Sequence, residues 1–394
     1  VYNFIQMFAH TPLFDGQIDA WDMHSAQYLY EMFNDAKVFN QPLNDWNFVV
    51  AEQMQAMFYA TPLFNQPLSN WNTSTVVYMQ DMFNQARAFN QDISNWDVSN
   101  VQYFNNMFYN ADSFNQDFTN WHTTNAVSME GMFNGADAFN GDVSNFDMNG
   151  VGNICYMFAN SHFNRPIGNW DTHTINHFCA TFQNNDSFNQ DISQWDMTGG
   201  WNVSSMFQNS VFNMPIDDWD VSNIHYFNFM FSGDQAFNQP IYKWNTASAN
   251  EMAGMFRWAY GFNQDVSQWN ISNVYYMQEI FQDSNISINH WSRFVQKVSD
   301  TTLHQWRNLS GSQYVNCATA AARTHIFTSP NDGGLGWWYW DYGVTQECKS
   351  DQSINFTQPA DFAVNKSRTL EATSTSELPV SFKWLSGPCE IDGG

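Results

Sequence analysis

Hydrophobic positions recur along the first three quarters of the chain with a period of 25 residues, which shortens to 24 at two places. Most units carry a Met-Phe pair, then Phe-Asn-Gln, then Trp-Asp-Val-Ser-Asn-Val or a close variant, and polar residues fill the positions between. A repeat of this kind predicts a stack of similar units, because no unit of this length can bury an apolar face alone. We therefore expect the rings of Trp46, Trp71 and Trp96 to lie inside the stack.

Two shorter periodicities within the unit predict its secondary structure. Residues 101–111 place apolar side chains three and four positions apart, which is typical of one face of a helix. Trp96 and Val98 alternate with the polar Asp97, which is typical of a short strand with one buried side. The sequence therefore predicts an α/β solenoid with a parallel sheet on one side and short helices on the opposite side.

The asparagine of the Phe-Asn-Gln motif recurs in register with the aromatic residues, at Asn40, Asn65, Asn90, Asn115 and Asn140. Each amide is expected to bond to the backbone of the neighbouring turn, since a tight bend leaves polar backbone groups that need partners. We predict a structural role for this row and no chemistry.

The order of these residues resembles that of a known repeat. In one unit the frame reads Ile93-x-x-Trp96-x-Val98-x-x-Val101-x-x-Phe104-x-x-Met107-Phe108-x-x-Ala111. It is similar to the BspA-like branch of leucine-rich repeats, a bacterial surface-protein repeat of about 25 residues, and the similarity covers residues 1–291. This chain carries Trp, Phe and Met where leucine-rich repeats usually carry Leu or Ile. The resemblance implies a leucine-rich-repeat-like solenoid of about 12 turns at a cell surface.

The charge of the chain argues against several kinds of partner. Its 394 residues carry a formal net charge of -25, from 38 acidic and 13 basic residues. The phosphates of nucleic acid and of anionic lipids would both be repelled. The sequence contains no run of 18 apolar residues and so predicts no membrane span. This excess of acidic over basic residues suits a protein outside the cell, in a salty or calcium-containing medium.

Cys155 and Cys179 each stand three residues before the second anchor Phe of their unit, so they occupy one slot on adjacent turns. A disulfide needs Cα atoms about 4.4 to 6.8 Å apart, whereas packed helices commonly lie about 8 to 10 Å apart. Two outcomes are open from the sequence: a disulfide between the two turns, or two exposed free thiols.

The repeat fades after Phe281, and residues 292–349 are predicted to cap the stack. Residues 291–306 are predicted to form a helix over the last turn, since an open end would expose apolar residues. The segment that follows resembles the capping segment of secreted proteins of the Bacteroidetes type. That resemblance implies a disulfide between Cys317 and Cys348, and with it an oxidising exterior.

Residues 350–394 change character once more. Alternating runs at 353–357, 368–373 and 380–384 are separated by turn-rich segments, which predicts strands. Their order resembles the bacterial immunoglobulin-like modules of adhesins. Three strands are fewer than the roughly seven of a sandwich, so we expect a partial β module and a chain that is part of a longer protein.

The sequence contains no motif typical of an enzyme. It has no phosphate loop, GxSxG elbow, HExxH helix or CxxC pair, and its carboxylates recur with the repeat. We therefore expect no catalysis and no cofactor. One acidic column is a candidate binding surface, because successive aspartates about 5 Å apart would attract calcium or a basic ligand. Its members are Asp97, Asp147, Asp171, Asp196 and Asp220.

A second candidate surface is a column of tyrosines on what is predicted to be the polar side of the helices: Tyr28, Tyr78, Tyr103, Tyr226 and Tyr276. Tyrosines are enriched in contact surfaces. The favoured hypothesis is a secreted or cell-surface adhesion protein that binds a protein or glycan on another surface through a rigid solenoid face. The alternative is a structural subunit that associates with copies of itself into an extracellular filament or sheath.

Overall fold

The computed structural model describes residues 2–300 continuously, and beyond them residues 308–310, 338–340, 354–356 and 372–374. The chain divides into two compact units, Val1–Gly343 and Val344–Gly394. The first contains strands β1 (Tyr2–Asn3), β2 (Ala26–Tyr28), β3 (Asn308–Ser310) and β4 (Trp338–Trp340), and helix α1 (Ile288–Asp300). The second contains strands β5 (Ile354–Phe356) and β6 (Ala372–Ser374).

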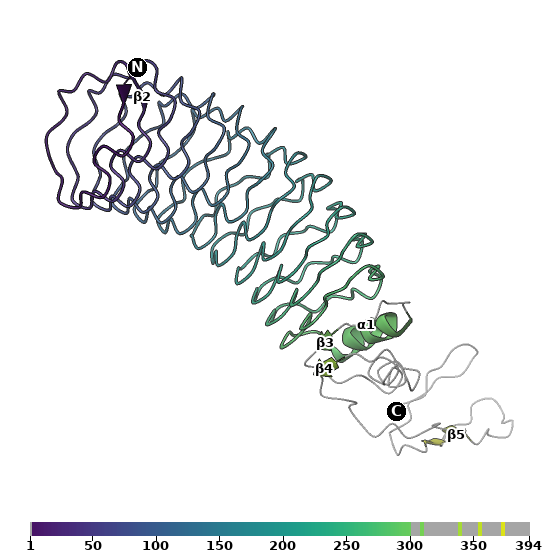
Figure 1. Cartoon of the computed structure of the whole chain (residues 1–394). Coiled ribbons are helices and arrows are strands. Elements are labelled where there is room, and N and C mark those ends of the chain that lie inside the picture. Colours follow the sequence, from purple (N-terminus) through teal and green to yellow (C-terminus); the bar gives the residue numbers. More distant parts are fainter. Residues whose placement is uncertain (1, 301–307, 311–337, 341–353, 357–371, 375–394) are drawn as a thin grey trace, which may run out of the picture. The chain divides into compact units, whose positions relative to one another are not determined.

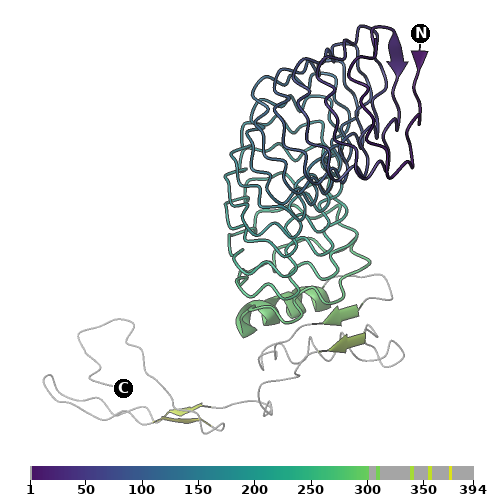
Figure 2. The ribbon, with the colours of Figure 1, turned by 90° about the vertical axis from the view of Figure 1, so that its left-hand side faces the viewer.

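Residues 2–287 wind as a succession of coils, one for each sequence repeat, and successive coils lie side by side (Figure 1, Figure 2). Strands β1 and β2 pair in parallel in the first coils. From β2 onward, one residue of every coil forms a parallel bridge with its counterpart in the next coil. We call this row the ladder, and its members are Tyr28, Gln53, Tyr78, Tyr103, Ser128, Asn153, His177, Asn202, Tyr226, Glu251 and Tyr276.

A run of turns replaces the short helix that the apolar spacing predicts, and residues 2–287 contain no helix. Asp81 and Gln85 have φ angles of 59° and 61°, and the same two slots are left-handed in every coil. A residue in this region interrupts a right-handed helix. The helical spacing therefore predicts correctly which side chains of the coil are buried. Its prediction of a helical backbone is wrong.

Backbone hydrogen bonding explains why turns replace the helix. The N–H groups of Asp81, Phe83 and Gln85 donate to carbonyl oxygens of the next coil, at 2.8, 2.9 and 2.7 Å. The N–H groups of Met82 and Asn84, which lie between them, donate three residues back along their own coil. Alternate N–H groups thus point along the stack, and bonds between coils take the place of bonds within a helix.

The segment predicted as a strand, Trp96 to Val98, forms no strand, and the ladder lies at the tyrosine slot instead. The rings of Trp71 and Trp96 stack 6.0 Å apart at 2°. The Trp96 Nε1–H donates to the Leu68 carbonyl oxygen at 3.0 Å. These side chains and Trp46 are buried, which confirms that the tryptophans lie inside the stack. The leucine-rich-repeat-like class as a whole stays a prediction.

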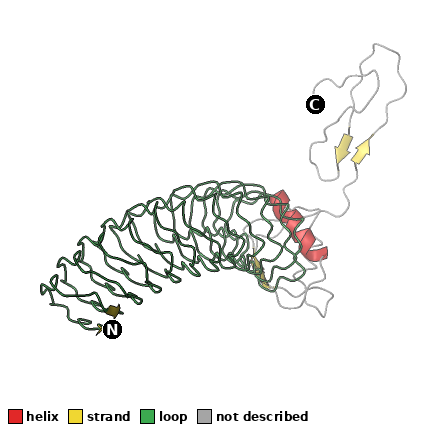
Figure 3. Ribbon diagram, turned by 90° about the horizontal axis from the view of Figure 1, so that it is seen from above, coloured by secondary structure: helices red, strands yellow, loops and turns green. Residues whose placement is uncertain are grey.

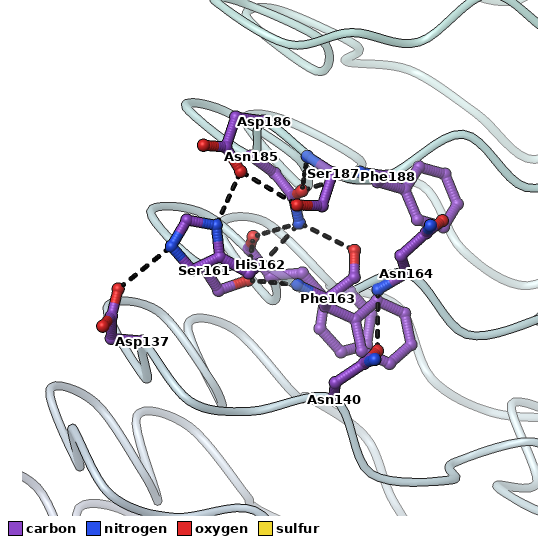
Figure 4. Close-up of polar contacts among 11 residues, drawn as sticks. Asp137, Asn140, Ser161, His162, Phe163, Asn164, Asn185, Asp186, Ser187 and Phe188 are labelled. Carbon is purple, nitrogen blue, oxygen red and sulfur yellow. Dashed lines mark hydrogen bonds and ion pairs between the residues drawn. The ribbon is translucent and has the colours of Figure 1, made fainter.

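The asparagines of the Phe-Asn-Gln motif link neighbouring coils as predicted. The Asn65 N–H donates to Asn40 Oδ1 at 2.9 Å, and the Asn90 N–H donates to Asn65 Oδ1 at 3.0 Å. The row continues across the first shortened unit, where the Asn164 N–H donates to Asn140 Oδ1 at 2.9 Å (Figure 4). Loss of one residue in that unit therefore leaves the column in register.

Helix α1 follows the last coil (Figure 3). Trp291 and Phe294 are buried, and their rings meet the Phe281 ring edge-on at 6.0 and 5.1 Å. The helix predicted at residues 291–306 therefore begins three residues earlier, at Ile288, and covers the apolar end of the coils. Residues 301–307 lie outside the described part. No helix of the described residues is long and apolar enough to cross a membrane.

Strands β5 and β6 of the second unit pair antiparallel, with Ile354 opposite Ser374. They coincide in part with the runs predicted as strands at 353–357 and 368–373. The third run, at 380–384, lies outside the described residues, as do Cys317 and Cys348. The immunoglobulin-like module and the disulfide of the cap therefore stay predictions.

Candidate functional site

Each coil presents two consecutive residues on the outside of the ladder, namely the bridging residue and the one before it. Gln102 and Tyr103 are accessible to solvent, while Val101 and Phe104 on either side of them are buried. The N–H groups of Gln102 and Phe104 donate to the previous coil and to the next coil, each at 3.0 Å. Backbone bonds on both sides therefore hold the two side chains outward. We call the surface formed by these paired residues the ladder face.

The tyrosines predicted as contact residues all lie on the ladder face, and none lies on a helix. Tyr78 and Tyr103 are on adjacent coils, and their rings stack 6.0 Å apart at 2°. Tyr28 precedes Tyr78 by two coils, and Tyr226 and Tyr276 are likewise two coils apart. The structure thus places these residues in one column but brings only Tyr78 and Tyr103 into direct ring contact.

The ladder face also carries a group of exposed aromatic rings that the repeat pattern does not predict. Trp201 is 44% exposed, and the rings of His177, His225 and Tyr226 lie 5.8, 5.9 and 5.4 Å from its own. Three successive coils supply these four residues, which we call the Trp201 cluster. The Asn250 Nδ2 lies 3.0 Å from the His225 Nδ1 and restrains that ring.

Trp201 is visible in the sequence only as an exception within its column. From β2 onward, the position before the bridging residue holds one other large aromatic residue, Tyr275. In the remaining coils it holds a polar or smaller residue: Gln27, Glu52, Val77, Gln102, Val127, Gly152, Asn176, His225 and Asn250. A large indole at an outward position has no role in the core. This departure from the repeat is the signal that could have identified the cluster.

The aspartates predicted as a binding surface serve as turn caps. Asp97, Asp196 and Asp220 each accept the backbone N–H two residues later, at 3.0, 2.9 and 3.0 Å. Asp147 makes the equivalent bond at 3.0 Å, and Asp171 makes it at 3.4 Å. Hydrogen bonds from the side chain and the backbone N–H of Ser99 hold the pKa of Asp97 below its usual range, and those from Ser222 do the same for Asp220. The carboxylates therefore have a local structural role in every coil where they occur.

One ion-pair group of the coils is centred on His162 (Figure 4). Its Nδ1 lies 2.6 Å from an Asp186 oxygen, and its Nε2 lies 3.3 Å from an Asp137 oxygen. The hydrogen bond to Asp186 is the main cause that raises the pKa of His162. Among the described residues, no three His, Cys, Asp or Glu side chains are arranged to hold a metal ion. Calcium therefore stays a prediction, and we propose no metal site.

Of the two outcomes open for Cys155 and Cys179, the structure has the disulfide. Their Cα atoms are 4.5 Å apart, which is within the range that the bond requires. The spacing of packed helices does not apply here, because the two residues lie in stacked turns whose backbones bond to each other directly. The disulfide joins two successive coils.

Stacked coils joined by a continuous ladder define a repeat protein. The chain belongs to the family described as "Mycoplasma protein of unknown function, DUF285", whose sequence profile matches residues 1–69, 44–146, 128–215 and 202–305. These overlapping matches together cover the coils and helix α1. No curated protein matches the chain.

Proposed function

We propose that this chain is an adhesion or recognition protein of the cell surface or the exterior, which binds a macromolecular partner through the ladder face. The observation that carries this proposal is the Trp201 cluster. Its indole, phenol and imidazole rings combine apolar surface with hydrogen-bonding groups. Aromatic residues of this kind are enriched in the centres of protein interfaces.

The backbone supports the proposal because it fixes the cluster before a partner arrives. The Trp201 N–H donates to the Asn176 carbonyl oxygen at 2.9 Å, and the Trp201 carbonyl oxygen accepts the His225 N–H at 3.0 Å. Behind the face, the rings of Phe178 and Trp195 lie 6.0 Å apart in the core. A surface held in this way loses little conformational freedom on binding, so less of the contact energy is spent on ordering it.

The exterior location rests on the disulfide between Cys155 and Cys179. Disulfides persist in oxidising compartments and are rare in the cytosol. The excess of acidic residues suits the same location, since it keeps molecules of the chain apart at moderate salt.

The alternative proposal, a subunit of an extracellular filament or sheath, would use tyrosines of the same face for contacts between copies. Tyr275 and Tyr276 favour it, because both are on the last bridged coil and are 49% and 55% exposed. A filament subunit would form ordered assemblies without any other partner. An adhesion protein would stay dispersed until its partner is added.

The test applies the fluorescently labelled whole chain to an array of immobilised extracellular-matrix proteins and polysaccharides. We expect at least one surface to retain the chain and Trp201→Gln to weaken that retention about tenfold, since truncating a central aromatic residue costs more than about 1.4 kcal/mol. Gln102 occupies the same column, so the substitution suits the backbone.

Trp258→Gln is the matched control. Trp258 is 41% exposed but lies outside the ladder face, and Gln85 stands in its column. Equal retention of wild type and Trp201→Gln, or no retention on any surface, contradicts binding through the cluster. Sedimentation of the unlabelled chain decides between the two proposals, because polymers that persist on dilution support the filament.

A further inference from the structure

Tyr242 differs from the residues at the same position in the other coils. It directly follows the buried Ile of its coil and is 54% exposed. The other coils place a small or polar residue there: Asp19, Asn44, Ser69, Ser94, Thr119, Ser144, Gly168, Ser193, Asp217 and Ser267. A phenol ring at this position contributes nothing to the core, so its role must be sought at the surface.

A hollow of about 230 Å³ lies beside the Tyr242 ring. Its other lining residues are Ile241 from the same coil and Gln264, Asp265 and Gln268 from the next. None of these residues belongs to the ladder face. The volume is below the roughly 300 to 1,000 Å³ of pockets that hold drug-sized ligands, so the hollow suits a ligand of about one six-membered ring.

Two of the polar groups in the hollow are held in place by neighbouring residues. The Gln264 Nε2 donates to the Asn238 carbonyl oxygen at 2.8 Å and to its Oδ1 at 3.0 Å, which leaves the Gln264 Oε1 as an acceptor. One Asp265 oxygen accepts the Ser267 N–H at 3.0 Å, and the other accepts Arg293 at 2.7 Å. Each carboxylate oxygen has a second lone pair for a further donor.

The charges around the hollow disfavour an anionic ligand. Lys243, next to Tyr242, is held between Asp217 and Asp218, with its Nζ 2.8 Å from an oxygen of each. Arg293 is similarly paired with Asp265. Three carboxylates thus face two cations, and the whole chain is strongly acidic. A ligand carboxylate or sulfate would be repelled at this edge.

We propose that this hollow binds one hexose unit of a neutral polysaccharide. A pyranose ring has an apolar face of C–H groups, which packs on the exposed Tyr242 ring, and a rim of hydroxyl groups. These hydroxyls donate to Asp265 and to the Gln264 oxygen, and they accept from the Gln268 amide. The site would add a sugar specificity that is separate from the contacts of the ladder face.

The experiment is saturation-transfer NMR on the whole chain with laminarihexaose, cellohexaose and mannohexaose as the neutral probes, and a hexamer of galacturonic acid as the anionic probe. We expect transfer to the ring C–H protons of at least one neutral hexamer. Tyr242→Ser should weaken binding about tenfold, because it removes the stacking surface, and Tyr242→Phe should retain it.

Serine is already the usual residue of this column, so Tyr242→Ser is expected to unfold at the same temperature as wild type. Tyr260→Ser removes an equally exposed tyrosine that does not line the hollow, and it should bind the sugar normally. Trp201→Gln should also bind normally, which separates this site from the ladder face. The proposal is overturned if no neutral hexamer shows transfer, if Tyr242→Ser binds as well as wild type, or if the galacturonic acid hexamer binds equally.

Discussion

Among single residues, Asp234 shows how the interior of the stack changes the chemistry of a side chain. It is fully buried and accepts two backbone N–H groups at 2.8 and 3.1 Å and the Ser210 hydroxyl at 2.7 Å. Burial raises the pKa of Asp234 to about 7. Two coils earlier, Asn185 fills the same slot and accepts the equivalent two N–H groups at 3.0 and 2.9 Å (Figure 4).

We expect Asp234→Asn to remove a loss of stability that wild type suffers as the pH rises. The ordinary pKa is 3.8 and the folded value is about 7, so the folded state holds the extra proton between these values. The stabilisation due to the protonated form is complete below pH 3.8 and disappears as the pH rises through about 7. Roughly three pKa units correspond to at most about 4 kcal/mol. Denaturant titrations at pH 4 and pH 8 measure the difference in free energy of unfolding between the two proteins.

The reverse exchange, Asn185→Asp, is the control for this prediction. It places a carboxyl in an equivalent buried slot and should introduce a similar fall in stability between pH 4 and pH 8. If the difference between Asp234→Asn and wild type were the same at both pH values, the buried carboxyl would not be the cause.

The residues that could be predicted from the sequence are those that recur. Trp96 and Phe83 repeat in register, and both are buried. Trp201 and Tyr242 were not predicted, since a repeat is recognised by what its units share. The acidic column stays a prediction as a binding surface. The role of its carboxylates as turn caps was not predicted, because the residue two positions later varies among Ser, Asn, Thr and, after Asp171, His173.

At the scale of the coil, the sequence pattern predicts the wrong backbone conformation. Apolar side chains three and four apart predict a helix, and the burial of residues 101, 104, 107 and 108 fits that pattern. The run of turns that replaces the helix buries side chains at the same spacing, and it contains two left-handed residues four positions apart. Gly131 and Gly135 of one coil, and Asn106 and Asn110 of the coil before, carry this signal, because Gly and Asn adopt the left-handed region most readily.

Exchanging Gly and Ala at one left-handed slot should change stability in opposite directions. Gly135 has φ 72°, and a Cβ there would lie 2.0 Å from the Asn110 Oδ1, so Gly135→Ala should lower the free energy of unfolding by more than about 1 kcal/mol. Ala60 has φ 52°, and Ala60→Gly should be neutral or stabilising by up to about 1 kcal/mol. Denaturant titration of both variants measures the two effects.

Ala86 provides the control, because it lies one residue beyond a left-handed position and is not itself left-handed. Ala86→Gly should therefore destabilise the chain by about 1 kcal/mol. If Ala60→Gly and Ala86→Gly cost the same, strain at the left-handed slot would not explain the effect of Gly135→Ala.

For the whole stack of coils, stability should be a sum of contacts between neighbours. The rings of the Met-Phe pairs form a column that continues from coil to coil: Phe83 lies 5.5 Å from Phe58 on one side and 5.6 Å from Phe108 on the other. In such an arrangement a change in one coil is felt mainly by the coils next to it. The sequence predicts this property directly, since it follows from the repeat.

Replacing both Cys155 and Cys179 by Ser should therefore loosen the stack locally. The bond closes a loop of 24 residues, for which the chain-entropy relation gives a loss of about 3.5 kcal/mol. Hydrogen exchange should quicken in the two coils that carry these residues and stay unchanged in the coils around Tyr28 and Tyr78.

The oxidised wild-type chain is the reference for this measurement, and the double variant should behave the same with or without reductant in these coils. A uniform rise in exchange over all coils would contradict stability summed over neighbours. It would show instead that the whole stack opens as one unit.

The continuity of the asparagine row across a shortened unit has a consequence for how such a chain can vary. Each coil presents nearly the same backbone groups and rings to its neighbour. After recombination between repeats has duplicated or removed an internal coil, the coils that become neighbours can therefore still pack on each other. The length of the stack is thus set by the number of coils, while Trp201 and Tyr242 are each gained or lost together with the single coil that carries them.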